Sequence, residues 1–506
     1  MSNSETTYTK LCEYVRETAL LESIEALLGW DERTYMPLAA GAYRADQITY
    51  LSGRIHQRRT DPRLKDWLDE LAESPLAKEP HSDTAATIRQ LRRNYQKQVK
   101  LPQKLVEELS RAAVLGQQVW VDARKANNYA AFEPTLKQMF KLQRQKAAAL
   151  GYKESPYDAL LDEYEPDETA SNVTRVLAAL RQELVPLVQA IGAGPKQPPI
   201  ALLERHFPAA AQEQFGKLAA AKIGFSFDRG RLDVTHHPFC SGMGPHDCRI
   251  TTRYDESFFP SAFFGILHEA GHGLYEQGLR PELYALPPGM YLSLGIHESQ
   301  SRMWENLVGR SRAFWDCFYP QAKTAFPAAL GDVALDDFYF AINDVRPSLI
   351  RVEADEATYN LHIIVRFELE QALIRGDLST ADLPGAWNDK YQEYLGITPP
   401  SDADGVLQDV HWSAGLVGYF PTYSLGNLYA AQFFATADKE LGGLDASFAK
   451  GEFGGLLDWL RRNIHQRGQC YTASELVKEV TGQPLSHGPL MQQLHSKYGT
   501  LFGVNP

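Results

Sequence analysis

The most informative stretch of this 506-residue chain reads Ser261-Ala-Phe-Phe-Gly-Ile-Leu-His-Glu-Ala-Gly-His-Gly-Leu-Tyr-Glu-Gln277. Its apolar residues recur at helical spacing, so we expect a single, largely buried helix. Pro260 suits the first turn of such a helix, and Gly278 suits its end.

Three residues of this stretch form the pattern H-E-x-x-H, namely His268, Glu269 and His272. Two histidines four positions apart lie on the same face of a helix, so their imidazoles can reach one tetrahedral zinc ion. Glu269 lies roughly 100° away around the helix, where it can touch a water on the metal without being a ligand. Zinc that acidifies a water, with a carboxylate to take the proton, is typical of amide hydrolysis. The pattern also arises by chance in on the order of one chain in a hundred of this length, but burying these groups without a shared partner would be costly.

A catalytic zinc site needs a third protein ligand. We expect Glu298, which lies 26 positions after His272 (298 − 272) and can return on a second helix packed against the first. Glu276 is an alternative on the same helix, but it points along the axis away from a site held by the two histidines. His297 is another alternative, although a histidine beside a ligand more often supports the site or lies at the surface.

Composition narrows the class of protein. The formal net charge is −12 with scattered acidic residues, which argues against a nucleic-acid partner and against polybasic membrane attachment. The five cysteines are widely spaced and form no C-x-x-C pair, so we expect reduced thiols rather than a disulfide framework. The N-terminus does not resemble a signal peptide, and no stretch approaches about 18 uninterrupted apolar residues. We therefore expect a soluble, cytoplasmic protein without a membrane span.

Helical periodicity dominates the chain. Before the H-E-x-x-H stretch we expect helices at 5–30, 41–58, 64–72, 82–97, 102–127, 132–149, 170–191 and 209–222. After it we expect helices at 292–308, 311–327, 334–343, 347–375, 380–394, 423–441, 450–465, 472–480 and near 490–498. Pro186 should kink or split the helix at 170–191. The Gly/Pro-rich segment 192–199 is a candidate linker, or a loop between helices.

The pattern changes just before the H-E-x-x-H helix. Residues 224–235 and 247–254 carry alternating and β-branched residues with Gly and Pro between them, which predicts a small antiparallel sheet of two or three short strands. Such a strand could present its backbone to an extended peptide. The fold class is therefore mainly α with a small sheet. Little marks independent domains, so we expect one domain over 1–506, with a helical part at about 1–200 and a catalytic part at about 201–506.

Seven motifs, in this order, make the chain resemble the carboxypeptidase Taq family of metallocarboxypeptidases over nearly its whole length. They are Leu28-Gly-Trp-Asp-Glu-Arg-Thr-Tyr-Met-Pro37, Gly230-Arg-Leu-Asp-Val-Thr-His-His-Pro-Phe239, Asp247-Cys-Arg-Ile-Thr251, His268-Glu-Ala-Gly-His272, His297-Glu-Ser-Gln300, Ile350-Arg-Val-Glu-Ala-Asp355 and Gly405-Val-Leu-Gln-Asp-Val-His-Trp412. The resemblance implies a single, saddle-shaped helical subunit with a central groove, usually a homodimer. It also implies removal of single residues from peptide C-termini with broad preference, one zinc or cobalt ion per subunit, and Glu298 as the third ligand.

An enzyme that acts at peptide C-termini must recognise a free carboxylate, and arginine offers a bidentate fork for it. Arg351 is the leading candidate, and Arg249 and Arg253 are weaker ones. Alternatively, Arg351 pairs with Asp355 four positions later on a helix, and both roles hold if Asp355 orients the arginine. Asp247 could accept a hydrogen bond from a zinc-bound imidazole, or it could cap a strand end.

The segment from Gln408 to Tyr423 is rich in donors and aromatic rings. Gln408 and Asp409 are candidates for substrate binding. The oxyanion of a tetrahedral intermediate needs donors besides the metal, and His411 with Tyr419 or Tyr423 could provide them. A histidine followed by tyrosines also occurs in helical peptidases that resemble thimet oligopeptidase. Otherwise these tyrosines are core packing.

These observations combine into one hypothesis, a zinc metallocarboxypeptidase in which Glu269 takes the proton of the attacking water and later delivers it to the departing amine. We expect its substrates to be peptides with a free C-terminus. An endo- or oligopeptidase of the thimet type is one alternative, because it shares the helical groove and the H-E-x-x-H helix. A helical binding protein with a vestigial metal site is the other.

Overall fold

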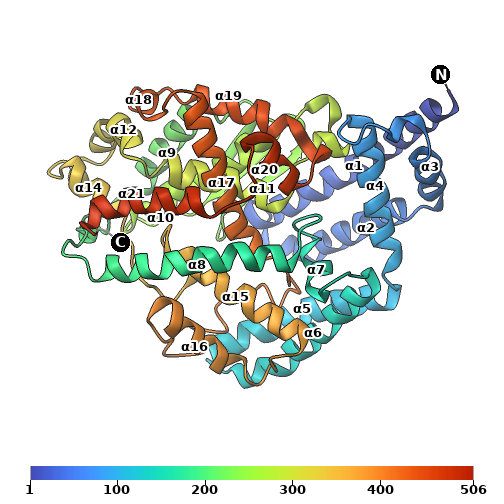
Figure 1. Ribbon diagram of the computed structural model, residues 1–506, viewed down its shortest axis with the longest axis horizontal. Helices are drawn as coiled ribbons and strands as arrows, with labels where there is room; N and C mark the ends of the chain where they lie inside the picture. Colours follow the sequence, from blue (N-terminus) through green and yellow to red (C-terminus); the bar gives the residue numbers. More distant parts are fainter. Residues whose placement is uncertain (1, 505–506) are drawn as a thin grey trace. The chain divides into compact units, whose positions relative to one another are not determined.

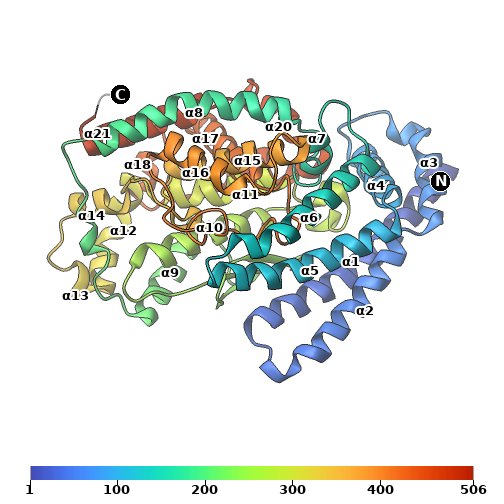
Figure 2. The same cartoon turned by 90° about the horizontal axis from the view of Figure 1, so that it is seen from below.

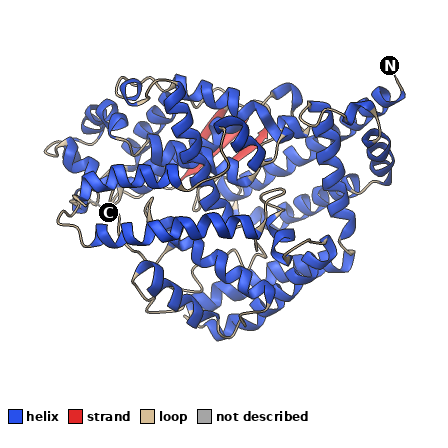
Figure 3. Ribbon diagram, in the orientation of Figure 1, coloured by secondary structure: helices blue, strands red, loops and turns tan. Residues whose placement is uncertain are grey.

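The computed structural model describes residues 2–504, and most of them are helical (Figures 1 and 3). The chain divides into two compact units, each assembled from three segments. The first unit comprises Met1–Val99, Pro199–Ile342 and Phe433–Gly482, and the second comprises Lys100–Pro198, Asn343–Gln432 and Gln483–Pro506. The Gly/Pro-rich segment 192–199 contains one of the points where the chain passes from one unit to the other.

The first unit contains the small sheet and most of the helices. They are α1 (Asn3–Thr34), α2 (Gly41–Arg59), α3 (Pro62–Ala72), α4 (Asp83–Lys100), α9 (Ala209–Ile223), α10 (Phe259–Glu276), α11 (Leu294–Arg302), α12 (Arg312–Ala325), α13 (Pro327–Leu330), α14 (Leu335–Ile342), α18 (Asp445–Phe448), α19 (Gly454–Asn463) and α20 (Ala473–Thr481). Helices α1 and α2 lie side by side as a hairpin (Figures 1 and 2).

The second unit is helical. Its helices are α5 (Gln103–Lys125), α6 (Tyr129–Leu150), α7 (Pro156–Leu161), α8 (Ala170–Gly192), α15 (Thr358–Arg375), α16 (Leu383–Leu395) and α21 (Gly488–Phe502). Helix α17 (Pro421–Glu440) begins in the second unit and ends in the first. Among residues 2–504, no helix combines the length and the apolar character that crossing a bilayer requires.

The predicted fold class, mainly α with a small sheet beside the H-E-x-x-H helix, is confirmed, but two helix predictions need correction. Helix α8 runs through Pro186 without a break, because Leu184 and Leu187 on either side of the proline are fully buried and hold the helix against its neighbours. The helix expected at 347–375 begins only at Thr358. Asp355 caps its start by accepting hydrogen bonds from backbone N–H groups there.

The sheet is mixed rather than antiparallel as we expected. It consists of β1 (Gly230–Val234), β2 (Cys240–Gly244) and β3 (Asp247–Thr252) in the order β1-β3-β2. Strand β2 forms an antiparallel hairpin with β3, whereas β1 pairs with β3 in parallel. The physical reason is the connection from β1 to β3, which has 12 residues (235 to 246) and includes β2, long enough for the crossover that a parallel pair needs.

Helix α10 is anchored at its N-terminal half by an aromatic core in the first unit. The ring of Phe263 stacks on Phe215 and on Phe259, with centroids 5.1 Å apart in both pairs, and it lies 5.3 Å from Trp315. Strands β2 and β3 pack against the same helix. Helix α10 is therefore packed against the aromatic core, the sheet and α11.

Candidate metal centre

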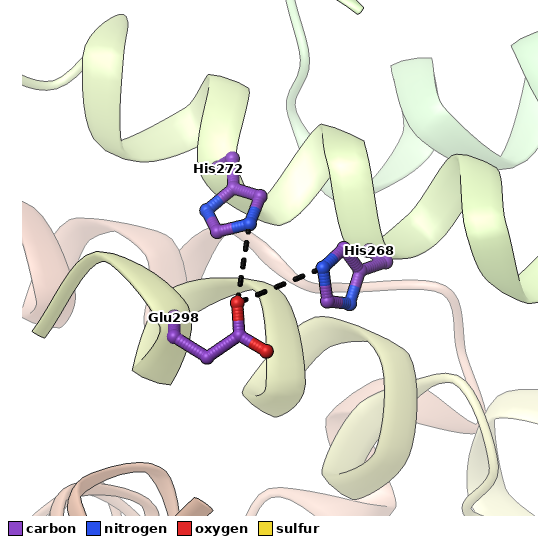
Figure 4. Close-up of side chains that lie close together, drawn as sticks. All are labelled: His268, His272 and Glu298. Carbon is purple, nitrogen blue, oxygen red and sulfur yellow. Dashed lines mark ion pairs between the residues drawn. The ribbon is translucent and has the colours of Figure 1, made fainter. Parts of the chain in front are cut away.

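Three side chains from helices α10 and α11 converge on one site (Figure 4). His268 and His272 come from α10, and Glu298 comes from α11, with their ligand atoms all within 4.8 Å of one another. Glu298 Oε2 lies 3.7 Å from His268 Nε2 and 3.4 Å from His272 Nε2. Metal–ligand bonds of about 2.1 Å in a tetrahedron place neighbouring ligand atoms about 3.4 Å apart. The residues therefore fit a divalent ion held by two nitrogens and one oxygen.

The glycine inside the motif allows this convergence. A Cβ atom at Gly271 would lie 2.6 Å from the carbonyl oxygen of Gln300 and 2.7 Å from the Cα of Ser301. Only a residue without a side chain permits α10 and α11 to approach so closely. The contact places Glu298, two positions before Gln300, opposite the histidines.

A carboxylate and a guanidinium that the sequence did not predict support His268 and Glu298. Glu305, in the π-helical turn Met303–Val308, has Oε2 2.8 Å from His268 Nδ1. Arg302 donates from Nε to Glu298 Oε1 at 2.7 Å and from Nη1 to Glu305 Oε2 at 3.2 Å. A carboxylate bound at Nδ1 fixes the imidazole so that Nε2 faces the ion. Arg302 and Glu305 lie four and seven positions after Glu298, a helical spacing that could have indicated them.

The two alternative ligands, His297 and Glu276, lie behind His272. His297 Nδ1 lies 2.5 Å from His272 Nδ1, and His297 Nε2 lies 2.9 Å from Glu276 Oε1. Neither residue belongs to the group of three ligand atoms, which contains Glu298 instead.

Burial and nearby charges adjust the protonation of the site. Burial raises the pKa of Glu269 to about 7 and lowers the pKa of His272 to about 3. Burial also opposes ionisation of Glu298, but the charges of Arg302 and His268 outweigh it and hold its pKa well below the usual range. A neutral His272 and an ionised Glu298 are the forms that bind a cation.

Arg351 lies in the second unit, in the short helix Arg351–Glu353, and is only 5% exposed. Its Nε and Nη2 atoms lie 2.9 Å and 2.8 Å from Asp409 Oδ1, and Nη1 donates to the hydroxyl of Tyr359 at 2.9 Å. On its other oxygen, Asp409 accepts from Arg366 Nε at 2.6 Å, and Arg366 is fully buried. Asp409 thus lies between two guanidinium groups.

Two other predicted residues near Arg351 have structural contacts. Gln408 Oε1 accepts from the backbone N–H of Arg351 at 2.9 Å and from Arg366 Nη2 at 2.7 Å. The carboxylate of Asp355 accepts from Thr358, through its N–H at 2.9 Å and its hydroxyl at 2.6 Å, at the start of α15. The pairing of Arg351 with Asp355 on one helix was therefore wrong, because the chain is not helical between them and Asp409 is the carboxylate beside Arg351.

The predicted oxyanion donors gather in the second unit. His411 Nε2 lies 3.4 Å from the Tyr423 hydroxyl, and the ring centroids of His411 and Tyr419 are 5.5 Å apart. His411 Nδ1 lies 3.8 Å from Asp409 Oδ1. Burial lowers the pKa of His411 to about 4, against the opposing effect of Asp409. His411 is therefore neutral near pH 7.

Asp247 and Arg249 lie together on β3 in the first unit. Arg249 binds Asp247 through two hydrogen bonds, of 2.9 Å from Nε and 2.8 Å from Nη2. The guanidinium of Arg249 lies over the ring of Trp30, 4.4 Å from its centroid. At His268 the supporting position predicted for Asp247 is occupied by Glu305.

Comparisons with known proteins cover nearly the whole chain and point to one family. A family model described as carboxypeptidase Taq (M32) metallopeptidase matches residues 10–498. Thermostable carboxypeptidase 1 of Thermus thermophilus is 48% identical over 508 residues, covering 99% of both chains. Carboxypeptidase 1 of Bacillus subtilis is 39% identical over 477 residues, covering 94% of this chain and 95% of its own. The crystal structure of the M32 carboxypeptidase from Deinococcus radiodurans R1 superposes with a TM-score of 0.95 at 42% identity, covering 99% of this chain and all of the other.

Proposed function

Because this chain belongs to the carboxypeptidase Taq (M32) metallopeptidase family and is a metallocarboxypeptidase, we propose that His268, His272 and Glu298 hold its catalytic divalent ion. The family predicted from the sequence motifs is confirmed, and the comparisons do not favour the thimet-type alternative. The observation that carries the proposal is the convergence of three ligand atoms within 4.8 Å. Two imidazoles and a carboxylate are a donor set of catalytic zinc, so we propose one zinc ion per chain, with cobalt as the substitute.

Glu269 acts as the general base and then as the general acid. When bound, the ion polarises the scissile carbonyl and makes a water more acidic. Glu269 takes the proton from the attacking water and delivers it to the departing amine. Its position beside His268 on α10 and its burial, with 7% of the residue exposed, support this role. So does its pKa, which burial raises to about 7, because a base works best when its pKa is close to the working pH.

Arg351 binds the C-terminal carboxylate of the peptide. The buried cluster of Arg351, Arg366 and Asp409 has two positive charges and one negative charge, so it favours a further anion. Asp409 holds the guanidinium of Arg351 and Gln408 holds its backbone N–H, so both contribute to substrate binding through Arg351. Arg249, fixed by Asp247, remains a weaker candidate for the same carboxylate.

His411 and one of Tyr419 or Tyr423 donate hydrogen bonds to the oxyanion of the tetrahedral intermediate. A neutral His411 retains one N–H group, and its lowered pKa supports this state. The contact between His411 and the Tyr423 hydroxyl favours Tyr423 as its companion.

Three further properties follow from the resemblance. The chain acts as one catalytic domain over 1–506, it forms a homodimer, and its substrates are peptides with a free C-terminus and broad preference for the last residue. A cytoplasmic location is supported by its five free cysteines, because reduced thiols are usual there.

Hydrolysis of matched peptides tests the role of Arg351. We expect N-blocked dipeptides with a free C-terminus to be cleaved, and the same peptides with a C-terminal amide to be cleaved far more slowly. Arg351→Lys keeps the charge but loses the bidentate fork, so it should raise KM for the free acid more than it lowers kcat. Arg375→Met, on an exposed pair with Asp377 in the same unit, is the control and should behave like the wild type. Equal cleavage of acid and amide by the wild type would remove Arg351 from this role.

A further inference from the structure

We propose that Glu276 and His297 are positioning residues that fix the orientation and the tautomer of His272 and thereby set the affinity of the protein for its metal ion. The three side chains form a hydrogen-bonded chain, here called the imidazole relay, that runs from His272 Nδ1 through His297 to Glu276 Oε1. This inference rests on the metal centre proposed above.

Metal binding through His272 Nε2 requires one arrangement of the protons along this chain. His272 Nε2 faces Glu298 and must keep a free lone pair to bind a metal, so the proton of the neutral ring is on Nδ1. That N–H donates to His297 Nδ1 at 2.5 Å, and His297 must therefore carry its own proton on Nε2. The second N–H donates to Glu276 Oε1 at 2.9 Å. A carboxylate oxygen is an acceptor, so the contact with Glu276 Oε1 favours the tautomer of His297 that carries its proton on Nε2.

The opposite arrangement would abolish metal binding. If the proton of His297 moved to Nδ1, two N–H groups would face each other across 2.5 Å. His272 would then have to move its proton to Nε2, the atom that faces Glu298. A protonated Nε2 has no lone pair for a metal ion. Glu276 therefore controls the ligand although two hydrogen bonds separate it from Nε2.

Close packing holds the relay in register. The rings of His297 and His272 have centroids 4.5 Å apart and planes 30° apart. Tyr291 packs edge-on against His297 with centroids 4.9 Å apart. At the Glu276 end of the relay, a Cβ atom at Gly242 would lie 2.7 Å from Glu276 Oε2. The carboxylate therefore lies directly against the backbone of β2. These contacts restrict the ring of His297 and the carboxylate of Glu276.

The two histidine ligands are thus supported differently. His268 donates directly to a carboxylate, Glu305, whereas His272 reaches its carboxylate only through a second imidazole. Loss of groups that orient a ligand typically costs 10–100-fold in metal affinity. We expect this range for removal of either member of the relay.

Metal affinity, measured by competition between the apoprotein and a chelator for Zn²⁺, tests the relay. The variants are Glu276→Ala, His297→Phe, which keeps an aromatic ring without its nitrogens, and the double variant. Each single change should raise the Kd for Zn²⁺ by 10–100-fold and should change the visible absorption of the Co²⁺-loaded protein. Because Glu276 acts only through His297, the double variant should bind Zn²⁺ no more weakly than His297→Phe alone.

Two conservative variants complete the test. Glu276→Gln keeps an oxygen that can accept from His297 and should recover most of the affinity lost in Glu276→Ala. Glu282→Gln changes an exposed glutamate six positions further on and should bind Zn²⁺ like the wild type. Unchanged affinity in Glu276→Ala, or independent and additive losses in the double variant, would overturn the relay. A wild-type protein without affinity for Zn²⁺ would instead remove the metal centre itself and, with it, the relay.

Discussion

Replacing Gly271 with alanine should separate the two helices that carry the metal ligands. The added Cβ would lie 2.6 Å from the carbonyl oxygen of Gln300, whereas ordinary van der Waals contact begins at 3.4 Å, so α10 and α11 must move apart by about 0.8 Å (3.4 − 2.6). Metal sites tolerate deviations of only about 0.2 Å in ligand distance. We therefore expect a loss of Zn²⁺ affinity of at least 10-fold, together with about 1–3 kcal/mol of stability lost by overpacking.

The assay compares Gly271→Ala with a matched variant on the same helix. A Cβ atom at Gly265 would have Thr252 Oγ1 at 3.9 Å as its nearest neighbour, so Gly265→Ala should fit without strain. Chelator competition measures the Kd for Zn²⁺, and urea unfolding of both apoproteins measures stability. If Gly271→Ala bound Zn²⁺ and unfolded as Gly265→Ala does, close approach of the two helices would not be what positions Glu298.

Three further results are expected. Asp409→Asn leaves Arg351 and Arg366 without their shared carboxylate and should cost about 3–5 kcal/mol at pH 7 in urea unfolding, whereas Asp377→Asn, in an exposed pair, should cost less than about 1 kcal/mol. Burial opposes ionisation of Asp409, but the two guanidiniums outweigh it and lower its pKa, so its contribution is present above about pH 4 and lost on further acidification. The difference in free energy of unfolding between the wild type and Asp409→Asn should therefore decrease below pH 4. A difference that did not depend on pH would contradict the ion-pair explanation. Removing the metal with a chelator should lower the melting temperature, and Zn²⁺ at 100 times its Kd should restore about 2.7 kcal/mol; equal melting of both forms would argue against the site. Glu305→Gln keeps the shape but removes the charge beside His268 and should raise the Kd for Zn²⁺ about 10-fold or more, with unchanged affinity as the contrary result.

Spacing along a helix made the metal ligands predictable. His268 and His272 share a face whatever surrounds them, and Glu298 was the acidic residue at a distance suited to a neighbouring helix. Arg302 and Glu305 lie on the same face as Glu298 but were missed, because charged residues on a helix are more often solvated than buried beside a metal. The fold class was equally predictable, since helical periodicity extends along most of the chain.

Partners that are distant in sequence could not be predicted. Asp409 binds Arg351 from 58 positions away, and only the folded second unit brings the two together. Asp355, four positions from Arg351, was the natural local partner, but it caps α15 instead. The parallel pairing of β1 with β3 was not predicted for a similar reason. Alternation of apolar and polar residues identifies a strand, but it gives neither the neighbour of the strand nor its direction in the sheet.

The central claim, that Glu269 moves the proton at a metal held by His268, His272 and Glu298, is tested most directly by Glu269→Gln. Metal content and turnover should be measured on the same preparation of this variant. We expect one metal ion per chain, as in the wild type, and a kcat lowered by about 10²–10⁴-fold. A metal-loaded Glu269→Gln protein that hydrolysed peptides at nearly the wild-type rate would contradict the account.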